Sequence, residues 1–304
     1  MPLYLQHHEI DKQKWDACIE QAYNGTIYPY SWYLDIVSPY WDGLIDGDYD
    51  KVMPLPFKKK YGIPYLYPPL FTQQLGVFSR EQLSDTSVSD FILAIPAKFK
   101  FIEANINAAN NFVDENYEII KRVNYELNLS QTHEQIIKNY NGDTKRNIKL
   151  AIKNGVKIIP DASVKEIIKI FSSNRGKDIG NIKRLDYVTL ESLIHFLQQK
   201  NQVVVLGAFT KEGSLCAGAF FIHSHNRYIF IFSGTNDEAK KTGAIRLLID
   251  RFIAEHCNQN LILDFEGSVI PGLAHFYQGF GSKESVYLRI KKNSLPSIIK
   301  WFKK

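Results

Sequence analysis

Cysteine is scarce in this sequence, and the histidines are not spaced as metal ligands. Cys18, Cys216 and Cys257 are odd in number, far apart and embedded in apolar or helical patterns, which argues against a disulfide framework and against a zinc site. No histidine stands in an HExxH or similar arrangement. These features favour a metal-free protein of a reducing compartment, the cytoplasm.

Several motifs of common enzymes are also missing. The chain contains no GxSxG elbow, no Walker phosphate loop and no Rossmann glycine fingerprint, which excludes most hydrolases, NTPases and dehydrogenases. The N-terminal MPLYLQHHEIDKQKW lacks the basic start and apolar core of a secretion signal, and no apolar run approaches the roughly 18 residues of a membrane span. We therefore expect an intracellular protein with no transmembrane segment.

The C-terminal segment LPSIIKWFKK places Trp301 and Phe302 before a basic end. Such a segment could form a helix on a membrane surface. A final helix that packs on its own domain is the commoner arrangement, and we expect that one.

The composition is that of a folded protein with a sizeable core. The 304 residues are 45% hydrophobic and 23% charged, and a chain of this length predicts two domains of about 150 residues. The net charge of +5 permits an anionic ligand but does not demand nucleic acid.

The first half of the chain predicts mostly strands. After an opening helix at 11–22, we expect short strands at 52–57, 65–70 and 74–78, a helix at 84–95, and further strands at 99–106 and 117–129. We assign 1–130 to a first domain. Residues 131–155 then predict two helices or one kinked helix, with Lys145, Lys149 and Lys153 on one face, and form a basic linking segment.

The second domain, 156–304, repeats the order of the first in clearer form. We expect a strand in VKIIP, two helices, a hairpin of VVVLGAF and LCAGAFFIHS, and the strand RYIFIFSGT. The helix GAIRLLIDRFIAEH, the strand LILDFE, a short helix and the strand ESVYLRIKK follow. Two copies of one supersecondary unit would explain the length and the number of strands together.

Two carboxylates close the strand LILDFE. The period of two places Asp264 and Glu266 on the same face of this strand. Because ligands of α/β sheets gather at the carboxyl ends of strands, these groups could accept a proton or hold an amine. Equally, they could bind nearby backbone N–H groups or a basic side chain and only order the turn.

Candidate anion sites lie in two other segments. The loop at Ser233 and Gly234 exposes backbone N–H groups between a strand and a helix, and these could hold phosphates or a carbonyl oxygen. Arg175 and Lys177 flank Gly176 and form a compact pair of cations, although a basic helix end that satisfies its own dipole explains them as well.

The second half resembles the GNAT acyltransferases in its element order and in NRGK, RYIFIFSGT, GAIRLLIDRFIAEH, LILDFEGS and HFYQGFGS. It looks more narrowly like the Fem-type peptidoglycan aminoacyltransferases and the BioF2-like acetyltransferases. This resemblance implies an α/β fold of two tandem GNAT-like domains with mixed central sheets, the first of them degenerate. It places Tyr277 where Fem enzymes have a lysine credited with stabilising the oxyanion, and a phenol can donate one hydrogen bond to that oxygen without bringing positive charge.

The GNAT motif that binds the pyrophosphate of coenzyme A falls on Lys240, Lys241, Gly243 and the two residues after it. The resemblance therefore implies an acyltransferase that moves an acetyl or aminoacyl group to an amine of a small molecule or a cell-wall precursor. Its donor would be acetyl-CoA, another acyl-CoA, or aminoacyl-tRNA, with tRNA as the carrier. The alternative is a non-catalytic module of the same fold that binds a nucleotide-linked or tRNA-borne ligand.

Overall fold

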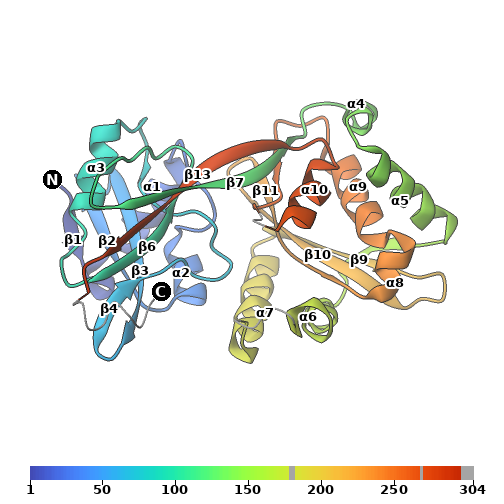
Figure 1. Cartoon of the computed structure of the whole chain (residues 1–304), viewed down its shortest axis with the longest axis horizontal. Coiled ribbons are helices and arrows are strands. Elements are labelled where there is room, and N and C mark those ends of the chain that lie inside the picture. Colours follow the sequence, from blue (N-terminus) through green and yellow to red (C-terminus); the bar gives the residue numbers. More distant parts are fainter. Residues whose placement is uncertain (178–181, 268–269, 296–304) are drawn as a thin grey trace. The chain divides into compact units, whose positions relative to one another are not determined.

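The computed structural model describes residues 1–177, 182–267 and 270–295 (Figure 1). The predicted C-terminal helix in LPSIIKWFKK lies outside the described residues, except for its first residue. By contacts the chain forms two compact units, Met1–Arg122 with 286–295 and Val123–Ser285. The domains predicted at 1–130 and 156–304 follow a repeat of elements rather than contacts, so that division stays a prediction.

The first unit is built on an antiparallel meander. Its elements are β1 (Leu3–Leu5), α1 (Lys12–Gln21), α2 (Ser31–Val37), β2 (Trp41–Asp46), β3 (Lys51–Lys60), β4 (Ile63–Leu66), β5 (Phe78–Ser79), α3 (Asp85–Leu93) and β6 (Phe101–Ile106). Strands β2, β3 and β4 pair antiparallel in sequence order, β1 pairs β2, and β6 pairs β4 in parallel. The helix α3 begins at its N-cap Ser84, whose hydroxyl accepts from the N–H of Ser87.

The second unit has the same order of elements. It contains α4 (His133–Lys138), α5 (Gly142–Lys153), β8 (Lys157–Pro160), α6 (Val164–Ser173), a 3-10 turn at Arg175–Lys177, α7 (Arg184–Gln199), β9 (Val203–Phe209), β10 (Leu215–Ser224), β11 (Arg227–Thr235), α8 (Asp237–Thr242), α9 (Ala244–His256), β12 (Ile262–Asp264) and α10 (Pro271–Gln278). Strands β8 to β11 pair antiparallel in order, and β12 pairs β11 in parallel.

Each unit thus has a meander, a helix and a strand parallel to the last strand of the meander. The predicted repeat and the predicted mixed sheets are confirmed. The long strands β7 (Glu118–Asn128) and β13 (Lys283–Asn293) are exchanged. Strand β7 follows β6 in the chain but pairs β12 of the second unit, and β13 follows α10 but pairs β6 of the first. The sequence pattern did not predict this exchange, because periodicity carries no information on partners.

Helices cover both faces of the sheet in the second unit (Figure 1). On one face α9 packs on β9 and β10, and the ring of Phe252 stacks on Phe221 with centroids 3.8 Å apart. On the other face α6 packs on β10 and β11, and Phe171 lies 4.7 Å from Phe232. The alternation of β10 supplies aromatic side chains to both layers of the core. In β11 a β-bulge shifts the alternation, so that Phe230 and Phe232 also lie on opposite faces.

Some predicted elements end elsewhere in the structure. The strand expected at 65–70 stops at Leu66, because Pro68 and Pro69 cannot continue a sheet ladder. The helical segment before Gly155 is two helices, and Asn141 begins the second by accepting from the N–H of Thr144. The sequence pattern did not predict the short elements α2 and β2.

Candidate functional site

The second unit has a cavity where its two parallel strands part. Pairing of β11 with β12 ends at Ile229 opposite Asp264. Directly beyond, two consecutive residues of β10 pair with Phe230 and Phe232 of β11. Ile231 between them is therefore the extra residue of a β-bulge. A bulge bends its strand, and the bent end of β11 leaves a wedge-shaped cavity of about 490 Å³ beside it. We call it the wedge cavity.

The lining of the wedge cavity combines aromatic and aliphatic side chains with a few charged groups. Because the strands part, side chains from both faces of the sheet reach it. The aromatic lining residues are Phe171, Phe230, Phe232, Phe265, Phe276 and Tyr277. The charged ones are Glu266, Arg175, Lys240 and Arg246. An apolar cavity with a few convergent polar groups is the usual form of a small-molecule site.

Glu266 lines the wedge cavity in a backbone conformation that its residue type disfavours. Its φ is 51°, in the left-handed region, which costs an L-residue about 1–2 kcal/mol. The backbone on both sides holds it there. The N–H of Glu266 donates to Oδ1 of Asp264 at 2.8 Å, and a β-carbon on Gly267 would lie 1.7 Å from the carbonyl oxygen of Val123.

The prediction that Asp264 and Glu266 share one face of a strand is wrong. Strand β12 ends at Asp264, so the alternation does not extend to Glu266. Asp264 is 4% exposed and is not among the residues that line the cavity. Its Oδ2 accepts from Arg227 at 2.8 Å, and the same Nη1 donates to Glu126 at 2.8 Å. Asp264 is thus buried and paired within the scaffold, and its part in a reaction stays a prediction.

The buried guanidinium of Arg227 depends on those two carboxylates. Burial disfavours its charge, but Asp264 and Glu126 together hold the pKa of Arg227 above its ordinary value. The cluster of these three charged residues joins three strands, since Glu126 belongs to β7, Arg227 to β11 and Asp264 to β12. It lies where β11 and β12 are still paired, next to the point at which they part and the cavity begins.

Tyr277 lies on α10 with its ring against the floor of the cavity. The ring stacks on Phe265 with centroids 5.2 Å apart. Burial raises the pKa of the Tyr277 phenol far above its ordinary value, the charge of Glu266 raises it further, and Arg175 lowers it. The phenol therefore keeps its proton at neutral pH. Because it makes no hydrogen bond to another described residue, its O–H is available as a donor in the cavity.

Three cations from three different elements line the wedge cavity. Arg175 follows α6, Lys240 lies on α8 and Arg246 lies in the first turn of α9. Arg246 pairs with Asp143, and its guanidinium lies 5.0 Å from the centroid of the Phe276 ring. Burial lowers the pKa of Arg246, and Asp143 opposes that shift. The sequence pointed to Arg175 and Lys240 but carried no signal for Arg246.

The remaining predicted site residues divide between the cavity and the scaffold. Ser233 and Gly243 line the cavity. Lys177 and Lys241 are exposed and do not. A β-carbon on Gly234 would lie 2.5 Å from the carbonyl oxygen of Ile167, so this glycine permits the close approach of α6 to β11.

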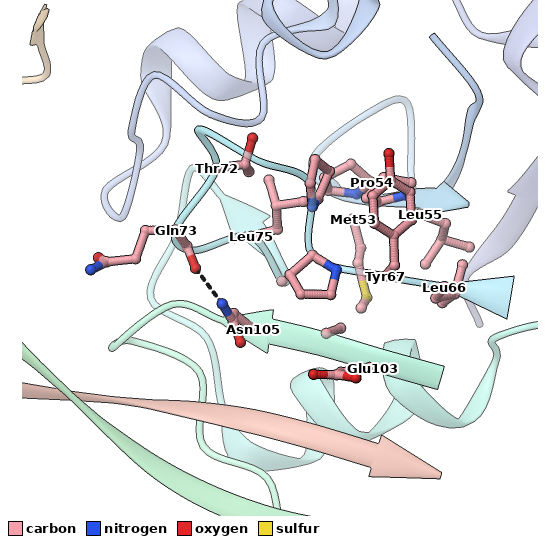
Figure 2. A pocket seen from close by; sticks show the side chains of 15 residues that line it. Met53, Pro54, Leu55, Leu66, Tyr67, Thr72, Gln73, Leu75, Glu103 and Asn105 are labelled. Carbon is pink, nitrogen blue, oxygen red and sulfur yellow. Dashed lines mark hydrogen bonds between the residues drawn. The ribbon is translucent and has the colours of Figure 1, made fainter. Parts of the chain in front are cut away.

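The corresponding wedge of the first unit is filled by its own chain (Figure 2). Strands β4 and β6 pair only to Leu66 and Ile102, and the chain then returns so that Leu75 bridges Ile106. The side chain of Asn105 donates to the carbonyl oxygen of Gln73 at 2.8 Å and holds the returning segment. The space left is about 20 Å³, room for about one water molecule. The wedge of the first unit is therefore too small for a ligand, whereas that of the second unit is not.

The described part of the chain contains no group of three or more His, Cys, Asp or Glu side chains that could hold a metal ion. None of its helices combines the length and the apolar character of a membrane span.

Comparison with known proteins identifies the fold. No family model and no curated protein matches the sequence. The crystal structure of FemX matches 97% of this chain and 99% of its own, with a TM-score of 0.67 and 12% identity. A conserved protein of unknown function from Bacteroides thetaiotaomicron matches 96% and 99%, with a TM-score of 0.64 and 10% identity. L-PGS from Bacillus licheniformis matches 96% and 95%, with a TM-score of 0.53 and 10% identity. The chain has the tandem-GNAT, Fem-like fold.

Proposed function

We propose that the chain is an N-acyltransferase whose reaction takes place in the wedge cavity. An amine nitrogen attacks the carbonyl carbon of an activated acyl group, and the C–N bond forms as the bond to the carrier breaks. The amine loses a proton, the carrier leaves as a thiol or an alcohol, and the product is an amide. Such a reaction needs a base, a donor for the oxyanion and a site for the carrier.

Glu266 is the proposed base. It is the one carboxylate among the described residues that line the cavity, and the strain of its backbone is what a functional position can retain. Asp264 is proposed as a positioning residue, because its carboxylate receives the N–H of Glu266 and takes no part in the cavity lining.

Two donors are proposed for the oxyanion. One is the phenol of Tyr277, which like any phenol is protonated at neutral pH and whose pKa burial and Glu266 raise further. The other is the edge of β11 beyond Ile229, where pairing with β12 has ended and the backbone N–H groups of the bulge border the cavity. Together they offer hydrogen bonds in a site whose apolar walls keep the local dielectric low.

The carrier is proposed to bear phosphate. Arg175, Lys240 and Arg246 line the cavity. Gly243, the N-cap of α9, also lines it, and the first N–H groups of a helix have no partner within the helix and favour an anion. Coenzyme A and the end of tRNA both bring phosphates, so either an acyl-CoA or an aminoacyl-tRNA suits these groups. The Fem-type resemblance favours a small molecule or a cell-wall precursor as the acceptor.

One observation carries the proposal: a carboxylate and a protonated phenol line the same cavity of about 490 Å³ beside three cations. A non-catalytic binding module is the second candidate, because Tyr277 cannot supply the positive charge of the Fem lysine. The two candidates differ in whether an amide forms.

The test is an assay for the amide product by mass spectrometry, with a panel of acyl-CoA and aminoacyl-tRNA donors and a panel of amines. E266Q should lower the rate by about 100-fold to 10,000-fold with an unchanged unfolding midpoint. K240M should raise the KM for the donor, whereas its matched control K241M should not. Lys240 and Lys241 are neighbours on α8, and each pairs with an acid three residues earlier, so only the cavity contact separates them. Binding of donors with no product from any pair would favour the module.

A further inference from the structure

The wedge cavity has more apolar wall than a small acyl group can use. Phe230, Phe232, Phe265, Phe276 and Tyr277 surround it with aromatic surface, and Leu273 of α10 adds an aliphatic side chain. We infer that the acyl group transferred by this chain is bulky and apolar, with a branched, long aliphatic or aromatic side chain. This inference rests on the proposed function and names the substrate class of the same site.

The first argument is size. A volume of 490 Å³ corresponds to about 16 water molecules at about 30 Å³ each. The carrier and the acceptor amine take part of this volume, and an acetyl or alanyl group beside them would leave the aromatic lining in contact with water. Water gains little from such walls, whereas each apolar methylene that displaces it stabilises the complex. In the first unit the chain itself occupies the corresponding space, and only about 20 Å³ remains.

The second argument is charge. Among the described lining residues, three cations face the single carboxylate of Glu266. Lys240 and Arg246 pair with Asp237 and Asp143, but neither aspartate lines the cavity. The lining itself therefore suits the phosphates of a carrier and disfavours a cationic side chain. If Glu266 receives the proton of the acceptor amine, no carboxylate is left to pair with a lysyl or arginyl group. An apolar side chain has no such requirement.

The third argument is the origin of the space. The cavity exists because Ile231 is bulged out of register with β10 and β11 has left β12. Ile231 is 7% exposed and Phe230 is 5% exposed, so the wall at the bulge belongs to the packed core. A rigid wall of this kind selects by volume, because it cannot close around a small group.

The experiment measures binding of two series of probes to the full chain without an acceptor, by calorimetry. The first series is acetyl-, butanoyl- and hexanoyl-CoA. The second is a set of amide-linked analogues of the aminoacylated tRNA end that carry alanine, lysine or phenylalanine. Affinity should rise by up to about fourfold per methylene, which corresponds to about 0.8 kcal/mol, in whichever series has the correct carrier. In the second series phenylalanine should bind most tightly and lysine least.

A paired variant ties the selectivity to the cavity. L273W adds volume at a lining position and should weaken the hexanoyl or phenylalanyl probe by about tenfold or more, while the acetyl or alanyl probe changes less than about threefold. The control is L185W. Leu185 lies on α7, is 72% exposed and does not line the cavity, so this variant should bind all probes as the unchanged protein does.

The outcomes separate this inference from the proposed function. Size-selective binding without an amide product would support a site for a bulky apolar group and contradict the proposed acyltransferase activity. An amide product with acetyl or alanyl donors at least as efficient as the large ones would keep catalysis and overturn the inference. Equal affinity across both series, or no binding in either, would also overturn it.

Discussion

The strained backbone of Glu266 leads to a prediction that separates its effect on stability from its effect on activity. We consider two substitutions, E266A and E266G. Both remove the carboxylate and should abolish acyl transfer if Glu266 is the base. They differ in the backbone, because alanine retains the cost of φ 51° and glycine does not.

The magnitude follows from two opposing terms. The left-handed conformation costs an L-residue about 1–2 kcal/mol, which glycine recovers. Glycine also gains freedom in the unfolded chain and so loses about 0.4–1 kcal/mol. E266G should therefore be about 0.5–1 kcal/mol more stable than E266A. In a unit of the size of Val123–Ser285, this difference raises the melting temperature by about 1–4 °C.

The assay is urea denaturation of the two variants beside the amide-forming assay. The control position is Asp161, which is exposed, has φ 53°, belongs to the same unit and does not line the cavity. D161G should likewise be more stable than D161A, and both should keep full activity. If E266G were no more stable than E266A while the control pair differed, the backbone of Glu266 would carry no strain. Full activity in either Glu266 variant would remove this residue from the reaction.

Three further predictions concern the scaffold. G267A should lower the free energy of unfolding by about 3 kcal/mol or more in urea denaturation, since its methyl would lie 1.7 Å from the carbonyl oxygen of Val123; a variant of normal stability would contradict the close approach. Burial raises the pKa of Asp35, but hydrogen bonds from a lysine ammonium and an indole N–H lower it further, to below its ordinary value. The stability that Asp35 contributes is therefore present above the unfolded pKa of about 3.9 and is lost as the pH falls through the lower folded pKa. D35N should lower the free energy of unfolding by about 1 kcal/mol at pH 6 and leave it unchanged at acid pH. Burial raises the pKa of Cys18 and of Cys216 to about 11, and a thiol reagent at pH 8 should label neither before the protein unfolds; rapid labelling of either would be contrary to this burial.

Much of the fold could be predicted because its signals are local. The apolar spacing of GAIRLLIDRFIAEH predicted a helix that the structure gives as Ala244–His256, and the alternation around RYIFIFSGT predicted β11 without error in its bounds. The repeat of a meander, a helix and a parallel strand followed from the order of these elements. The strand predicted as LILDFE is the counterexample, because it ends at Asp264 when Glu266 turns left-handed.

The candidate site could be predicted only in part. Glu266 and Tyr277 were found from a strand end and from a family motif, and both line the wedge cavity. Arg246 could not be found, since it is one basic residue on an amphipathic helix, and its role depends on a neighbour in α10 and an acid in α5.

The sequence by itself determined which segments become helices and strands and in which order they come, because periodicity, caps and turn residues act over a few residues. Only the tertiary structure decided which of two nearly adjacent carboxylates faces the cavity. That choice depends on Arg227, which takes Asp264 into the core from another strand, and on the bulge at Ile231, which opens β11 away from β12. The first is a contact between residues 37 positions apart and the second is a register shift between β10 and β11, and no local pattern records either.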